Sequence, residues 1–155
     1  MSVVTEALEA KLKHHAYKIR RYALQMGEVQ GQGYIGQALG WADVLAVAYC
    51  HAMDVTAENT ADEQRDRFLL SHGHYAIALY AALIEAKIIE ESELYTYGSD
   101  DSRLPMSGMA MYTPGMEISG GSLGIGLTIG VGMALALNYK NNKQFIYNSM
   151  SDGEL

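Results

Sequence analysis

The segment that most constrains the fold is the glycine-rich stretch from Thr113 to Leu155. It contains a glycine turn at 120–124, an uncharged small-residue segment from Ile125 to Tyr139, and a short apolar run from Phe145 to Asn148. The second part predicts a helix and the third predicts a strand. Two adjacent glycines in the turn reach positive φ at low cost and let a ligand approach the main chain.

The predicted helix carries more glycine than a helix normally tolerates. Each glycine in a helix interior costs about 1 kcal/mol relative to alanine, and this helix has Gly126, Gly130 and Gly132. Gly126, Gly130 and Ala134 are spaced by four, so they predict a flat face that packs closely against a neighbouring element. The glycines therefore indicate either a packing role or a ligand role.

The predicted strand leads directly into Ser151, Asp152 and Gly153. In open α/β sheets, ligands bind at the carboxyl ends of the strands. A carboxylate beside exposed backbone N–H groups suits a magnesium ion that carries a diphosphate. We therefore expect a ligand site around Asp152.

The rest of the chain alternates between helical and strand patterns. Apolar periodicity predicts a helix over 4–26 that Gly27 ends, and apolar segments predict helices over 41–53 and 75–89. A strand is expected over 68–71. Ser71-His72-Gly73-His74 follows that strand, so His74 is expected at the ligand end of the sheet.

Three features allow other interpretations. Residues 31–36 match G-x-G-x-x-G, but a helix precedes them where the dinucleotide fingerprint needs a strand. Ile118 to Tyr139 is uncharged and long enough for a membrane span, yet it opens on a glycine turn and lacks basic flanks. His72 and His74 could form half of a metal site, but no second His/Cys pair lies at zinc-finger spacing.

Composition limits the partners. The net charge of −7 argues against nucleic acid and against an anionic membrane surface. Cys50 is the one cysteine, which excludes an internal disulfide and fits a reducing compartment. The N-terminal residues have the mixed-charge pattern of a helix rather than of a signal peptide. A cytoplasmic protein is expected.

GGSLGIGLTIGVGMALA followed by SDGEL resembles the N-terminal half of transketolases, and most closely the separate N-terminal subunit of two-subunit transketolases. The resemblance covers nearly the whole chain. It implies an α/β thiamine diphosphate-binding fold, with a parallel sheet flanked by helices. It also implies that residues 1–155 are one diphosphate-binding domain, incomplete after Leu155.

The resemblance implies transfer of a two-carbon ketol unit between sugar phosphates, with thiamine diphosphate and Mg²⁺ (or Ca²⁺) as cofactors. Asp152 is the implied metal ligand, and the implied cofactor-binding residues are His74, Gly121, Ser122, Leu123 and Gly153. No catalytic residue is expected within this chain. The activating glutamate would come from a C-terminal, pyrimidine-binding subunit, in a hetero-oligomer of dimeric type.

Two departures from the family concern the substrate. Tyr34 and Ser107 stand where transketolases usually have histidines that face the sugar. Neither side chain can be a cation at pH 7, which predicts an atypical sugar substrate. Two alternatives remain: a non-catalytic subunit that only binds a partner, or a component of another thiamine diphosphate enzyme, such as deoxyxylulose-phosphate synthase or a dehydrogenase E1.

Overall fold

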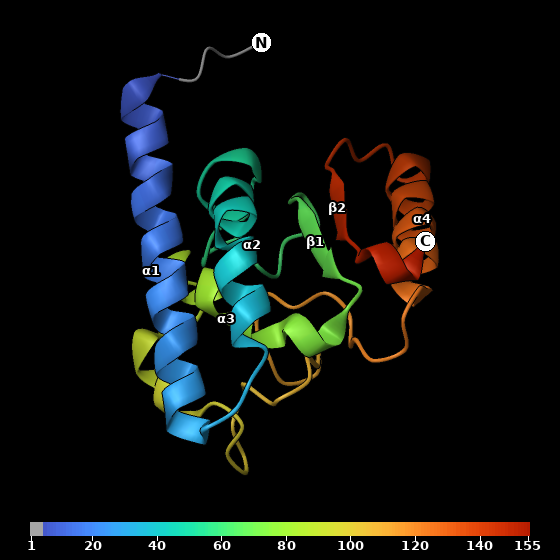
Figure 1. Ribbon diagram of the computed structural model, residues 1–155. Helices are drawn as coiled ribbons and strands as arrows, with labels where there is room; N and C mark the ends of the chain where they lie inside the picture. Colours follow the sequence, from blue (N-terminus) through green and yellow to red (C-terminus); the bar gives the residue numbers. More distant parts are fainter. Residues whose placement is uncertain (1–4) are drawn as a thin grey trace.

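A computed structural model describes residues 5–155 and places helices on both faces of a small parallel sheet (Figure 1). The helices are α1 (Glu6–Gln30), α2 (Ile35–Val47), α3 (Ala76–Glu85) and α4 (Ile125–Tyr139), and the strands are β1 (Arg67–Leu70) and β2 (Ile146–Ser149). A π-helical turn covers Ala48–Ala52, and 3-10 turns cover Gly73–Tyr75, Glu91–Thr96 and Asp152–Glu154.

β1 and β2 pair in parallel, from Arg67 with Ile146 to Leu70 with Ser149. Parallel strands end at the same edge of a sheet, so the loops after Leu70 and after Ser149 emerge side by side. The predicted parallel sheet flanked by helices is confirmed.

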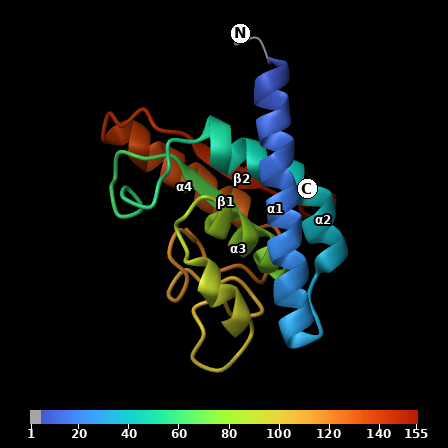
Figure 2. The same cartoon turned by 90° about the vertical axis from the view of Figure 1, so that its left-hand side faces the viewer.

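The two faces of the sheet carry different neighbours. Phe68 packs in the core with α1, α2 and α3, and its ring lies 5.9 Å from the Trp41 ring. Leu69, the next residue, faces α4 instead, because side chains alternate along a strand. Figure 2 shows α4 and the long helix α1 on different sides of β1 and β2.

α1 is longer than the sequence predicted. Thr5 caps it, with its hydroxyl oxygen accepting the Leu8 N–H at 3.2 Å, and Gly31 ends it with a φ of 67°. The prediction that Gly27 ends the helix is wrong. Gly27 lies inside α1, where a Cβ would fall 2.4 Å from the Ile35 side chain, so this glycine lets α2 pack closely. Val4 lies outside the described residues.

α4 has the predicted bounds, and its glycines divide by face. Gly126 and Gly130 are buried against the sheet, which confirms the predicted packing face for these two. Ala134 and Gly132 are exposed, so the prediction is wrong for Ala134 and packing within this chain does not explain Gly132. No helix within residues 5–155 is long and apolar enough to cross a membrane.

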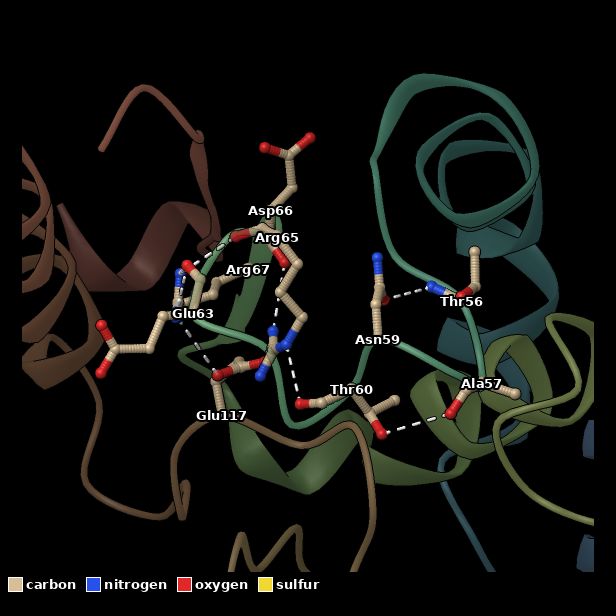
Figure 3. A network of polar contacts seen from close by, with 9 residues as sticks. All are labelled: Thr56, Ala57, Asn59, Thr60, Glu63, Arg65, Asp66, Arg67 and Glu117. Carbon is tan, nitrogen blue, oxygen red and sulfur yellow. Dashed lines mark hydrogen bonds and ion pairs between the residues drawn. The ribbon is translucent and has the colours of Figure 1, made fainter. Parts of the chain in front are cut away.

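A polar network fixes the other end of the sheet (Figure 3). Arg65 donates to the Thr60 carbonyl at 2.8 Å, to the Asp66 carbonyl at 3.1 Å, and to the Glu117 carboxylate. Both side chains of the Arg65–Glu117 pair are 10% exposed. Since Glu117 closely precedes the glycine turn, the pair anchors the segment that leads into that turn.

Asp66 joins the starts of the two strands. Its carboxylate accepts the N–H of Phe145 at 2.8 Å and the N–H of Asp54 at 2.9 Å. The entry to β2 is therefore held to the entry of β1 by a side chain as well as by the backbone ladder.

Candidate functional site

Three loops meet at the carboxyl edge of the sheet through glycine backbones. The Gly73 carbonyl accepts the Gly108 N–H at 3.1 Å, and the Gly108 carbonyl accepts the Gly120 N–H at 3.0 Å. The turn after β1 is thus joined to the 104–113 loop, and that loop is joined to the glycine turn before α4.

Gly73 and Gly120 also touch directly. A Cβ on Gly73 would lie 2.4 Å from the Gly120 Cα, and a Cβ on Gly120 would lie 2.3 Å from the Gly73 Cα. The prediction that Gly120 and Gly121 serve positive φ is wrong, because within the turn only Gly124 has a positive φ, of 82°. Gly120 is needed for close approach instead.

The predicted cofactor residues of the glycine turn form an open surface. Gly121, Ser122 and Leu123 are exposed. Space is free within 4 Å of the position that a Cβ would take on Gly121, and the same holds at Gly153. These residues fit the approach of a ligand to the main chain, since a side chain at either glycine would occupy that space.

The structure brings Tyr34 beside His74. His74 lies in the 3-10 turn after β1, and its ring centre is 5.0 Å from that of Tyr34 and 4.6 Å from that of Tyr75. Tyr34 directly precedes α2 and is 48% exposed. Ser107 is exposed, and its hydroxyl lies 3.5 Å from the Gly120 carbonyl. Both predicted substrate residues therefore neighbour predicted cofactor residues or their supporting loops.

Asp152 follows β2 and is exposed. One of its carboxylate oxygens accepts the Gly153 N–H at 3.0 Å. Among residues 5–155, no group of three or more His, Cys, Asp or Glu side chains could hold a metal ion. A single carboxylate fits Mg²⁺, which binds mainly through water and phosphate oxygens.

His72, to which the family resemblance gives no role, connects the ends of the two strands. It is 2% exposed, and its Nε2 lies 3.1 Å from the Ser149 hydroxyl. Its ring centre is 5.0 Å from that of Trp41 and 4.3 Å from that of Tyr75. Burial lowers the pKa of His72, which favours the neutral imidazole. The residue links the ends of β1 and β2.

Glu154 is a second residue of the site that the sequence did not predict, although Ser151 and Glu154 have the spacing of a capping box. Burial alone would raise the pKa of Glu154. Hydrogen bonds from the Ser71 and Ser151 hydroxyls and from the N–H groups of Ser151 and Gly124 outweigh it and lower the pKa to about 2.

Two cavities lie beside the site. One of about 560 Å³ is apolar, lies between α2 and β2, and is lined by none of the predicted cofactor residues. The other, of about 310 Å³, opens beside Asp152 and is also lined by His72, Tyr75, Ser149 and Ser151. The predicted metal ligand Asp152 and the buried His72 therefore both line the smaller cavity.

Residues 12–152 match the family described as transketolase, thiamine diphosphate binding domain. The chain belongs to this family. The match spans every helix and strand beyond the first turns of α1, and it includes the glycine turn, His74 and Asp152. The resemblance predicted from the sequence is confirmed.

Curated relatives extend the transketolase assignment. A transketolase family protein of Sinorhizobium fredii is 72% identical over 93% of this chain, which covers 52% of that protein. The 6-deoxy-6-sulfo-D-fructose transketolase subunit of a Clostridium species is 36% identical over 92% of the chain, again 52% of that protein. An apulose-4-phosphate transketolase subunit of Actinobacillus succinogenes is 36% identical over 79% of the chain, or 45% of that protein. The chain spans about half the length of these relatives.

Solved transketolases share the fold. The Leishmania mexicana enzyme superposes with a TM-score of 0.84 at 28% identity, over 92% of this chain and 23% of that one. The Campylobacter jejuni enzyme gives a TM-score of 0.83 at 26% identity, over 99% and 24%. This chain therefore corresponds in fold to about a quarter of the length of each of these enzymes.

Proposed function

We propose that this chain is the thiamine diphosphate-binding half of a two-subunit transketolase, which transfers a two-carbon ketol unit between sugar phosphates with the help of Mg²⁺. Residues 1–155 would form the diphosphate-binding domain. One observation carries the proposal: the loops bearing His74, Gly121 and Asp152 meet at the carboxyl edge of a parallel sheet, in a chain that matches the family over residues 12–152.

Each predicted residue has a task consistent with its place. Asp152, exposed after β2, would hold the magnesium ion, and His74 and the Gly153 N–H would hold the diphosphate. The open backbone at Gly121 to Leu123 would lie against the thiamine rings. When bound, the cofactor supplies the nucleophilic carbon that allows a ketose carbon–carbon bond to be cleaved.

We propose that a separate subunit completes the site and supplies the activating glutamate. Two of the curated relatives are named as subunits of transketolases. In addition, the outer face of α4 exposes a row of apolar side chains spaced by four: Leu127, Val131, Leu135 and Tyr139. Exposed apolar patches of this kind are typical of protein interfaces, which supports docking of a partner on α4.

The substrate proposal rests on Tyr34 and Ser107. Both can donate and accept hydrogen bonds, but neither presents the imidazole that ordinary transketolases use. The names of two relatives refer to apulose-4-phosphate and to 6-deoxy-6-sulfofructose. We therefore propose an atypical sugar as donor or acceptor. Normal turnover of xylulose 5-phosphate by the complex would contradict this part.

The decisive test is a calorimetric titration of thiamine diphosphate with magnesium, on this chain alone and on its mixture with the candidate partner subunit. Binding only in the mixture is expected. Asp152→Asn should weaken magnesium-dependent binding at least tenfold, whereas Asp100→Asn, at an exposed loop carboxylate, should leave it unchanged. A complex that forms by size exclusion yet binds no cofactor would overturn the enzyme proposal in favour of a non-catalytic subunit.

A further inference from the structure

Glu154 lies where three segments of the site converge. One carboxylate oxygen, Oε1, accepts the Gly124 N–H at 3.0 Å and also the Ser71 hydroxyl. The other oxygen, Oε2, accepts the Ser151 N–H at 2.7 Å and the Ser151 hydroxyl at 3.1 Å. One side chain therefore binds the end of β1, the glycine turn and the loop after β2.

Ser71 extends this connection into α4. The residue is fully buried, and its hydroxyl oxygen accepts the Gly126 N–H at 3.2 Å. Gly126 permits this contact because a Cβ there would fall 2.3 Å from the Ser71 hydroxyl oxygen. The Glu154 carboxylate thus stands at the N-terminus of α4, where a negative charge is favourable.

The arrangement requires a carboxylate rather than an amide. All four groups that face Glu154 donate, and each carboxylate oxygen faces one backbone N–H, from Gly124 or from Ser151. A hydroxyl can rotate to become an acceptor, but a backbone N–H cannot. Whichever way a glutamine were turned, its NH₂ group would point at a backbone donor.

We propose that Glu154 is a positioning residue that sets the spacing between the Gly120–Gly124 turn and the Asp152 turn. Its consequence for the cofactor rests on the proposed function, in which these two turns hold opposite ends of thiamine diphosphate. Because the carboxylate accepts hydrogen bonds from both sides at once, its loss frees each turn to move independently of the other.

Amide hydrogen exchange of the full chain tests the spacing without any cofactor. In Glu154→Gln, exchange of residues 120–127 should be at least tenfold faster, while exchange in α1 stays within twofold of wild type. Glu90→Gln, at an exposed glutamate without a side-chain partner among the described residues, is the matched control and should change neither.

Two exchange results would overturn the proposal: no change at residues 120–127, or an equal acceleration there and in α1, which would indicate global destabilisation. If Glu154→Gln does not fold, Ser151→Ala takes its place, because it removes a single hydroxyl donor to the carboxylate. It should accelerate exchange at 120–127 about threefold, and an unchanged rate there would overturn the proposal.

Cofactor binding in the complex with the partner separates positioning from catalysis. The dissociation constant of thiamine diphosphate should rise at least tenfold in Glu154→Gln, while the rate at saturating cofactor stays within threefold. A lower saturated rate with unchanged affinity would overturn the positioning role. If the wild-type complex binds no thiamine diphosphate, the proposed function fails, and the exchange experiment alone decides the role of Glu154.

Discussion

Gly73 and Gly120 are in backbone contact, although 46 residues of chain lie between them. The turn after β1 and the turn before α4 come from distant parts of the sequence, and they meet only because neither residue has a Cβ. The contact places His74, the neighbour of Gly73, next to the turn that contains Gly121.

Replacing Gly120 by alanine should separate these turns. The new Cβ would lie 2.3 Å from the Gly73 Cα, and backbone cannot rotate away as a side chain can. We expect Gly120→Ala to lower the free energy of unfolding by about 3 kcal/mol, at the upper end of overpacking costs. Urea denaturation measures this. Gly121→Ala is the control, with no neighbour within 4 Å of its Cβ, and should stay within about 0.5 kcal/mol of wild type. Equal effects at both positions would refute the contact.

The same comparison can be made within α4. A Cβ on Gly126 would fall 2.3 Å from the Ser71 hydroxyl oxygen and 2.8 Å from the Ser71 Cα, so Gly126→Ala should destabilise the chain by about 2 kcal/mol. Gly132 is exposed and has open space around its Cβ position, so Gly132→Ala should stabilise by up to about 1 kcal/mol through helix propensity. The melting temperatures of the two variants should shift in opposite directions from that of wild type. Shifts of the same sign would show that α4 does not pack on the sheet through Gly126.

Much of this fold could be predicted because it depends on local patterns. α4 has the predicted bounds, and β1 and β2 lie within one residue of the predicted strands at each end. The positions of Asp152 and His74 after strands follow directly from that order. Gly27 was misread because a glycine in a helix can either end it or admit a neighbour, and only the position of Ile35 distinguishes the two.

The framework of the site could not be predicted, because it depends on long-range contacts. Glu154 meets Ser71 and Gly124 only after the chain has folded, and His72 meets Ser149 in the same way. Nothing in the spacing of these residues indicates which of several polar side chains will face each other. The capping-box spacing of Ser151 and Glu154 was the single local signal.

The buried Arg65–Glu117 pair predicts that a substitution far from the carboxyl edge of the sheet will strongly lower the free energy of unfolding. Glu117→Gln would leave the buried Arg65 charge without an anionic partner, because the glutamine oxygen and the carbonyls of Thr60 and Asp66 are all neutral acceptors. We expect a loss of about 3 kcal/mol in urea denaturation, the lower end for breaking a buried pair. Glu9→Gln removes the exposed pair between Glu9 and Lys13 and should not change stability measurably. A small effect at Glu117 would mean that solvent reaches Arg65.

His72 predicts a pH dependence of stability. Burial lowers the pKa of the folded-state imidazole below the ordinary value of 6.5, and it outweighs a backbone hydrogen bond and the Glu154 charge, which oppose the shift; His74 adds a smaller lowering. Between the lowered pKa and 6.5, the unfolded chain therefore binds more protons than the folded one. The free energy of unfolding should fall as pH decreases below 6.5, by at most about 1.4 kcal/mol per pH unit from this residue.

The test compares slopes rather than absolute stabilities, because removing the ring also disturbs packing against Trp41 and Tyr75. Urea denaturation between pH 7 and pH 5 should show a shallower loss of stability in His72→Gln than in wild type, since glutamine does not titrate. His51→Gln, at an exposed histidine after α2, should keep the wild-type slope. If His72→Gln and wild type lose stability in parallel, His72 binds protons equally in the folded and unfolded chains, and the lowered pKa of the folded-state imidazole is refuted.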